Sequence, residues 1–273
     1  MGSITDNGIE LRNLRIGYGD TVVLDNINAS FPKGKISCIL GGSGCGKSTL
    51  LRHILGLRKP ISGQIRIKGH DLFGLPHKEF RKVRRQMGVL FQDGALLGAL
   101  NLGDNVALPL REHTKLAPSV IAELVHHNLS LVGLEKFAHY YPSELSGGMR
   151  KRAGLARALV MQPSILLCDE PTSGLDPINA AQMDKLLVDL KAQFPDMSII
   201  VVSHDLQSLF CIAEHVVVLH DGGLAFEGNL EALQASDDAY LRQFLDRTAG
   251  DTQVHPASLS TEIQEQLDAY ILR

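Results

Sequence analysis

The stretch Gly41–Ser48 places a lysine and a hydroxyl directly after a run of glycines, in the order G-x-x-x-x-G-K-S, and Thr49 follows. Glycine lets the backbone wrap closely around an anion, so that successive N–H groups point at phosphate oxygens. A helix that begins near Lys47 adds the positive end of its dipole. In this pattern the lysine reaches the β- and γ-phosphates and the Ser48 hydroxyl coordinates Mg²⁺.

A glycine-rich turn that only caps a helix is the alternative interpretation. The apolar run Ile36–Leu40 before the glycines and the helical pattern after them supply the strand and helix that the phosphate-binding motif requires. The sequence therefore predicts a nucleoside triphosphate site. Its predicted contacts are Gly41, Ser43, Gly44, Cys45, Gly46, Lys47, Ser48 and Thr49.

Two carboxylates follow a buried strand far downstream. Ile165–Cys168 is apolar, and Asp169 and Glu170 come directly after it. Ligands of open α/β sheets bind at the carboxyl edge of the strands. We expect Asp169 to hold Mg²⁺, directly or through water, and Glu170 to polarise the water that attacks the γ-phosphate. Taken alone, the pair would be an ordinary turn before Pro171, but the upstream phosphate site makes it the second half of one active site.

A second glycine-rich helix start lies at Ser146-Gly147-Gly148, ahead of a helical stretch rich in Ala and Leu. A serine and two glycines at a helix N-terminus predict another anion-binding site. One phosphate tail does not need two such sites in one chain. The simplest interpretation is that this one binds a nucleotide held by another subunit.

The elements that must position these residues alternate between strands and helices, which predicts an α/β fold with a parallel sheet. Ile9 to Phe31 is expected to form two extended runs around a turn at Gly17–Asp20, and Lys47 to Leu55 a helix. Further strands are predicted at 64–67, 88–91, 165–168, 199–203 and 216–220.

The pattern changes to purely helical between about residues 95 and 158, with a helix predicted over Pro118–Leu131. We therefore predict a nucleotide-binding domain over 1–247 with an antiparallel β subdomain and an inserted all-helical subdomain at about 95–158. A tail over 248–273 is predicted to contain an amphipathic helix at Thr261–Leu272, with Thr261 and Gln264 in a capping-box arrangement. This helix is expected to pack on its own domain or on a partner.

Composition excludes several classes of protein. The formal net charge is −3, which argues against nucleic acid as the main partner. No apolar run approaches the roughly 20 residues of a membrane-spanning helix, and the polar start predicts no secretory signal. The cysteines lack CxxC spacing and are expected to be reduced thiols of a cytosolic protein. We expect no metal other than Mg²⁺.

Together these motifs resemble the ATP-binding cassette (ABC) ATPases, and the resemblance covers nearly the whole chain. Leu145-Ser146-Gly147-Gly148 matches the family's signature sequence. By the resemblance, Tyr18 stacks on adenine, and Gln92 contacts Mg²⁺ and the attacking water and transmits the nucleotide state to a permease. Asp176, in Ser173-Gly174-Leu175-Asp176, bridges two subunits, and His204 contacts the γ-phosphate.

The resemblance implies a mechanism. Two copies of the chain form a homodimer that sandwiches two ATP molecules head to tail, each between one copy's Gly41–Thr49 and the other copy's Ser146-Gly147-Gly148. Hydrolysis at Glu170 separates the halves and moves an integral-membrane permease. Lys47, Gln92, Glu170 and His204 are the catalytic residues that it implies, and Ser48, Gln92 and Asp169 are the metal ligands.

Several stretches are similar to the ATPase of the Mla/Mce lipid-transport systems of Gram-negative bacteria. They are Met87–Leu96, Asn105–Thr114 and Arg242–Leu245, together with Met149 where the superfamily usually has Gln. Leu97 departs from this pattern by replacing an aromatic residue. The similarity implies phospholipid transport between the inner and outer membranes, on the cytoplasmic side of the inner membrane. It also allows a small cytoplasmic accessory subunit and a periplasmic lipid-binding Mce subunit.

Alternative functions stay open at this point. They are an ABC importer or exporter for another substrate, a non-transport ABC ATPase, and a non-hydrolysing cassette. One cassette without a heptad run argues against the non-transport class, and intact Lys47, Glu170 and His204 argue against loss of hydrolysis. The basic run Arg81–Arg85 is either a contact for acidic lipid headgroups or a solvated helix face.

Overall fold

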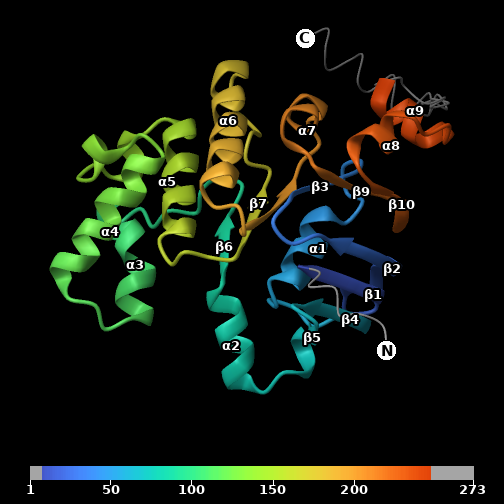
Figure 1. The fold of residues 1–273 in the computed structure, drawn as a ribbon, viewed down its shortest axis with the longest axis horizontal. Helices are drawn as coiled ribbons and strands as arrows, with labels where there is room; N and C mark the ends of the chain where they lie inside the picture. The colour runs from blue at the N-terminus through green and yellow to red at the C-terminus, as the bar shows by residue number, and fades with distance from the viewer. Residues whose placement is uncertain (1–7, 247–273) are drawn as a thin grey trace, which may run out of the picture. The chain divides into compact units, whose positions relative to one another are not determined.

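A computed structural model describes residues 8–246 (Figure 1). The chain divides into a first compact unit that ends at Ala235 and a second that begins at Ser236. The predicted tail helix at Thr261–Leu272 and the polar start at residues 1–7 lie outside the described residues. The predicted domain boundary at residue 247 stays a prediction.

The strands are β1 Ile9–Tyr18, β2 Thr21–Phe31, β3 Ile36–Leu40, β4 Ser62–Ile67, β5 His70–Asp71, β6 Met87–Leu90, β7 Ile165–Asp169, β8 Ser198–Val202, β9 His215–His220 and β10 Gly223–Gly228. The helices are α1 Lys47–Ile54, α2 His77–Arg85, α3 Leu102–His113, α4 Pro118–Leu131, α5 Gly147–Leu159, α6 Pro177–Gln193, α7 Leu206–Ile212, α8 Leu230–Gln234 and α9 Ala239–Asp246. Short 3-10 turns lie at Leu72–Gly74, Glu135–Phe137 and Pro142–Glu144.

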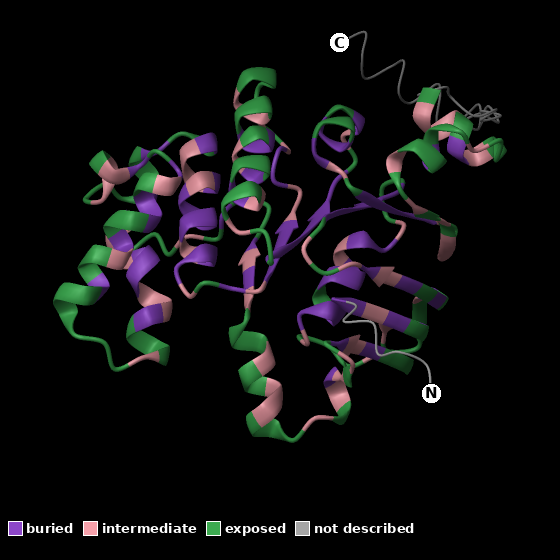
Figure 2. Ribbon diagram, in the orientation of Figure 1, coloured by how far each residue is buried: buried purple, intermediate pink, exposed green. Residues whose placement is uncertain are grey.

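The central sheet has the strand order β10-β9-β3-β8-β7-β6. Its strands from β9 to β6 pair in parallel, and β10 pairs antiparallel with β9. Every residue of β3 and β8 is buried, as continuous apolar runs in a covered parallel sheet require (Figure 2). Because the strands are parallel, the segments that follow β3, β6, β7 and β8 all leave the sheet at one edge. The predicted site residues, which lie on these segments, are therefore close together in space.

The second sheet is antiparallel, with the order β2-β1-β4-β5. Helix α1 packs on β1 of this sheet and on β7 and β8 of the central sheet. One hydrophobic cluster joins both sheets through buried residues such as Leu14, Leu50 and Val202. The phosphate-binding loop, which directly precedes α1, is thus anchored in the core of the first unit.

Between β6 and β7 the chain is helical, as predicted. Helices α3, α4 and α5 pack against one another, and the described residues 91–164 contain no strand (Figure 1). Two strands were not predicted. They are β5, which is only two residues long, and β10, in which glycines at both ends interrupt the alternation of polar and apolar residues. The predicted strand at 88–91 ends one residue earlier, at Leu90, so Gln92 lies in the following turn.

Among the helices of residues 8–246, none combines the length and the hydropathy that crossing a bilayer requires.

Candidate active site

The loop between β3 and α1 has the conformation that its glycines predict. Gly41, Gly44 and Gly46 have φ angles of 147°, 79° and 102°, which residues with a side chain rarely adopt. Gly46 caps α1 without a side-chain hydrogen bond. A Cβ atom at Gly46 would lie 2.9 Å from Val23 and 3.0 Å from Leu24, so β2 also excludes a side chain there. The first N–H groups of α1 are therefore left free to bind an anion.

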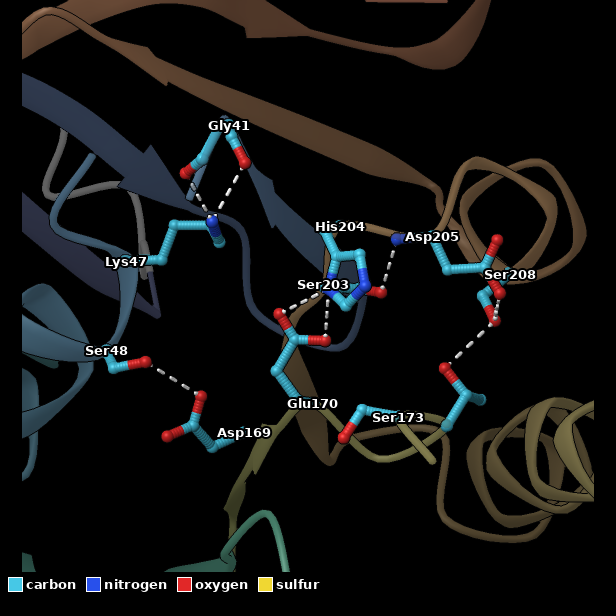
Figure 3. Close-up of polar contacts among 12 residues, drawn as sticks. Gly41, Lys47, Ser48, Asp169, Glu170, Ser173, Ser203, His204, Asp205 and Ser208 are labelled. Atoms are coloured by element: carbon cyan, nitrogen blue, oxygen red, sulfur yellow. Dashed lines mark hydrogen bonds and ion pairs between the residues drawn. The ribbon is translucent and has the colours of Figure 1, made fainter. Parts of the chain in front are cut away.

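Lys47 is buried at the start of α1, and its ammonium group lies across the loop. Nζ donates hydrogen bonds to the carbonyl oxygens of Gly41 at 2.8 Å and Gly42 at 2.9 Å (Figure 3). The surrounding loop thus satisfies the buried charge and fixes its position. A cation held beside free helix N–H groups is the arrangement that a phosphate chain needs.

Ser48 and Asp169 meet at the carboxyl edge of the sheet. The Ser48 hydroxyl donates to Oδ1 of Asp169 at 3.2 Å (Figure 3). Burial raises the pKa of Asp169, the bond from Ser48 lowers it, and the charge of Glu170 raises it further. A hydroxyl and a carboxylate oxygen side by side are hard oxygen ligands of the kind that Mg²⁺ prefers, so this pair fits the predicted metal.

Glu170 and His204 form the second polar pair of the site. Nδ1 of His204 lies 2.9 Å from Oε1 and 2.8 Å from Oε2 of Glu170. The side chain of Glu170 is 14% exposed and that of His204 is 66% exposed, so the carboxylate is shielded while the imidazole reaches solvent. Glu170 has a φ of 52°, in the left-handed region that non-glycine residues rarely occupy. Such conformations gather at functional sites.

The remaining predicted motifs form two further helix starts. Ser146 caps α5 and accepts a hydrogen bond from the backbone N–H of Met149 at 3.2 Å. Asp176 caps α6 and accepts from the N–H groups of Ile178 and Asn179, each at 3.1 Å. The hydrogen bond from the Asn179 side-chain amide, together with these backbone bonds, lowers the pKa of Asp176. Ser146, Gly147 and Asp176 are exposed.

A model of the family described as ABC transporter matches residues 24–173, which is more than half of the chain. The chain belongs to this family. It is the ATP-hydrolysing, ATP-binding subunit of an ABC transporter.

Relatives of known name agree with this assignment. The intermembrane phospholipid transport system ATP-binding protein MlaF of Haemophilus influenzae is 42% identical over 242 residues, which are 89% of this chain and 91% of that protein. The probable ribonucleotide transport ATP-binding protein mkl of Mycobacterium leprae is 42% identical over 257 residues, which are 94% of this chain and 73% of that protein.

Solved structures share the fold. The ATP-binding cassette MJ0796, in a dimeric post-hydrolysis state bound to ADP and phosphate, superposes with a TM-score of 0.74 at 32% identity. That comparison covers 81% of this chain and 98% of the cassette. The predicted α/β cassette fold with an antiparallel sheet and a helical subdomain is thereby confirmed.

Within this ABC ATPase the predicted residues fall into two groups. Lys47, Ser48, Asp169, Glu170 and His204 converge at one edge of the central sheet, and the register of β6 and β7 brings Gln92 to the same edge, with its side chain exposed. The signature residues and Asp176 form the other group. None of the hydrogen bonds or ion pairs described for residues 8–246 joins Ser146, Gly147, Gly148 or Asp176 to Lys47, Ser48 or Asp169.

Tyr18 lies at the end of β1, where its hydroxyl is 3.1 Å from Oγ1 of Thr49 and accepts from Arg52 at 3.1 Å. The guanidinium of Arg58 lies 4.5 Å from the centre of the tyrosine ring. The bond to Thr49 lowers the pKa of Tyr18, burial opposes this effect, and Arg52 and Arg58 lower the pKa further. The phenol is thus fixed beside α1. Adenine stacking at Tyr18 stays a prediction.

Sequence reasoning missed two cations on α5. Arg157 donates to the carbonyl oxygens of Gly94 and Ala95, each at 2.8 Å, and so fixes the segment that follows Gln92. Burial lowers the pKa of Arg157. Lys151 makes comparable bonds near Glu170. The available signal was the presence of charged residues within the Ala-, Gly- and Leu-rich sequence of α5.

Proposed function

We propose that this subunit hydrolyses Mg²⁺-bound ATP at the edge of the central sheet, with Glu170 as the general base. The observation that carries the proposal is the convergence of three groups at that edge. They are Lys47 with the glycine-rich loop that holds it, the Ser48–Asp169 pair at 3.2 Å, and the Glu170–His204 pair at 2.9 Å. Each of the three groups supplies a different part of phosphoryl transfer, which needs positioning and charge stabilisation more than covalent chemistry.

The residues then have separate roles. Lys47 and the loop N–H groups bind the β- and γ-phosphates, while Ser48, Asp169 and Gln92 hold the metal. Bound Mg²⁺ would neutralise charge on the phosphate oxygens. Glu170 accepts a proton from the attacking water, and His204 orients that carboxylate and approaches the γ-phosphate.

We further propose that two copies bind two ATP molecules head to tail. The exposed signature end of α5, which is unconnected to Lys47, Ser48 and Asp169 within the described part of the chain, supports a role in another copy's site. The dimeric cassette structures of similar fold support it as well. Asp176 at the start of α6 would then lie at the contact between copies.

The transported substrate that we propose is phospholipid. Support comes from MlaF proteins, which match at 41–42% identity over about nine-tenths of both chains. The complex would contain an integral-membrane permease, a small cytoplasmic accessory subunit and a periplasmic lipid-binding Mce subunit. This subunit would lie peripherally on the cytoplasmic side of the inner membrane. The mycobacterial mkl relatives favour ribonucleotides as a second candidate substrate.

The catalytic proposal is tested by Glu170→Gln, which keeps the size of the side chain but removes the base. We expect kcat to fall by roughly 10²- to 10⁴-fold while ATP binding persists, and ATP to trap the variant as a dimer. The wild-type rate should rise more than linearly with protein concentration or require the permease. A Glu170→Gln variant with full turnover would rule out Glu170 as the base, and a fast rate independent of concentration would rule out the sandwich.

The substrate proposal is tested on the complex that co-purifies with the subunit from membranes. After reconstitution, phospholipid transfer between labelled vesicles and ATP hydrolysis are measured together, and ribonucleotides other than ATP are added in parallel. We expect coupled lipid transfer and no response to ribonucleotides. Hydrolysis that responds only to ribonucleotides would make ribonucleotides, and not phospholipid, the transported substrate.

A further inference from the structure

Lys151 lies in the second turn of α5, where only 5% of the residue is exposed. Its ammonium group donates to the carbonyl oxygen of Glu170 at 2.9 Å and to the carbonyl oxygen of Ser173 at 2.6 Å. The hydroxyl of Ser173 lies 3.4 Å from the same nitrogen. A lysine ammonium has three N–H donors, so these contacts account for all of them.

The acceptors belong to the turn that presents the proposed base. The peptide of Glu170 directly follows β7, and Ser173 closes the same turn by donating its N–H to the Glu170 carbonyl at 3.2 Å. Glu170 keeps a left-handed φ of 52° there, a conformation of a kind that costs on the order of 1 kcal/mol or more. Such a conformation persists only when surrounding contacts hold it, and Lys151 supplies two of them.

The surroundings of Lys151 lower its pKa on balance. Burial lowers the pKa of this lysine, while the carboxylates of Asp93 and Glu170 raise it. Carbonyl oxygens bonded to a cation form stronger hydrogen bonds than those bonded to a neutral donor. Lys151 therefore holds the turn from Glu170 to Ser173 in place through hydrogen bonds.

Lys151 also lies five residues after Ser146 on the same helix. We propose that Lys151 is a positioning residue that sets the Glu170 turn for hydrolysis and couples it to the signature end of α5. This proposal rests on the proposed role of Glu170. In a head-to-tail dimer the signature end contacts the partner's nucleotide, while the turn serves the chain's own nucleotide. The rigid helix between them transmits the closure of one site to the base of the other.

The test compares Lys151→Met and Lys151→Arg in the full chain with Lys185→Met as the matched control. Lys185 is on α6, its side chain is 76% exposed, and it pairs only with Asp189 among the bonds described for it. The readouts are kcat, the KM for ATP, and the stoichiometry and Kd of a fluorescent ATP analogue, which normalises rates to folded protein. Glu170→Gln is measured alone and combined with Lys151→Met.

We expect Lys151→Met to lower kcat by about 10- to 100-fold and to change the Kd of the analogue by less than about twofold, because misplacing a reacting group by about 1 Å costs rate rather than affinity. Lys151→Arg, which keeps a cation for the same carbonyls, should have an intermediate kcat. Lys185→Met should match the wild type. In the Glu170→Gln background, Lys151→Met should lower kcat no further, since both changes remove one step.

Unchanged kcat in Lys151→Met, a parallel loss of affinity and rate, or an arginine variant no better than methionine would each overturn the proposal. If Lys151→Met does not fold, a reduced kcat with unchanged Kd in Lys151→Arg supports it, and a wild-type kcat there overturns it. The proposed function is judged separately. An active Glu170→Gln variant would rule out Glu170 as the base, whereas an inactive Glu170→Gln beside a fully active Lys151→Met would rule out only the positioning role of Lys151.

Discussion

Helices α1 and α5 both begin at glycine-rich turns, yet the two starts are built differently. The start of α1 has a glycine cap without a side-chain bond, a buried lysine, and a carboxylate facing it from β7. The start of α5 is capped by the side chain of Ser146 and is exposed to solvent. The first groups the proposed phosphate and metal ligands within one chain, whereas we propose that the second completes a site in another copy.

The proposed function accounts for this difference between the two helix starts. A phosphate chain held by α1 needs a fixed cation and metal ligands, and these come from segments that the parallel sheet brings to one edge. The start of α5 offers N–H groups, a hydroxyl, the helix dipole and the nearby guanidinium of Arg150. We expect these groups to bind an anion weakly unless a second surface encloses it. We therefore expect changes at α1 to remove ATP binding and changes at α5 to remove only hydrolysis.

The largest expected effect is that of Lys47→Met. Methionine preserves the packing of the buried stem but removes the cation that the Gly41 and Gly42 carbonyls hold. We expect kcat/KM to fall by at least roughly 10²-fold, as on removing a charged group that stabilises transition-state oxygens. Binding of the fluorescent ATP analogue should weaken in parallel. Unchanged binding would mean that α1 is not the primary phosphate site.

Gly147→Glu makes the corresponding change at α5. A side chain fits there, because a Cβ atom would come no closer than 3.9 Å to Arg150. A carboxylate in the first turn suits the helix dipole, so the apo protein should be as stable as the wild type. Facing a partner's phosphates, it should lower kcat by roughly 10- to 100-fold without changing the Kd of the monomer.

The control is Gly147→Ala, which adds a side chain without charge and should retain activity. A mixture of Lys47→Met and Gly147→Glu proteins sharpens the comparison further. In a mixed dimer, one of the two sites is intact, because it combines the α1 start of the Gly147→Glu copy with the α5 start of the Lys47→Met copy. If half of the dimers are mixed and the sites act independently, about a quarter of the wild-type rate should return. A mixture no faster than its components would contradict a head-to-tail arrangement.

The sequence predicted the α1 half of this comparison more completely than the α5 half. Glycine spacing, the lysine and the apolar strands are local features, and they sufficed to predict the phosphate-binding loop and to name Ser48 and Asp169 as ligands of one metal ion. The contacts of Lys151 and Arg157 depend on how α5 packs against turns that are distant in sequence, and a basic residue in a helix does not indicate its acceptor. Strand β10 was missed because terminal glycines hide its alternation.

A smaller effect is expected for Ser146→Ala in the apo protein. Losing the cap bond to Met149 should cost about 1 kcal/mol, which corresponds to a Tm lower by about 2–4 °C in a domain of this size. Ser146→Asp keeps a capping oxygen and should retain the Tm while losing hydrolysis. The start of α1 has no side-chain cap. An unchanged Tm in Ser146→Ala would show that the Ser146 cap does not stabilise α5 either, and the two helix starts would not differ in this respect. Thermal unfolding without nucleotide measures both variants.

The smallest effect concerns the carboxylate that faces α1. Burial raises the pKa of Asp169, so the folded state favours its protonated form. The stability that this contributes is present below the ordinary aspartate pKa of about 3.9 and is lost as pH rises through the raised value. Asp169→Asn cannot ionise and keeps an oxygen for Ser48. We expect its Tm to equal that of the wild type near pH 4 and to exceed it by roughly 1–3 °C at pH 8. A Tm difference independent of pH would show that burial does not destabilise the ionised form of Asp169. Mg²⁺-ATP favours the ionised carboxylate, so it should stabilise the wild type more than the variant.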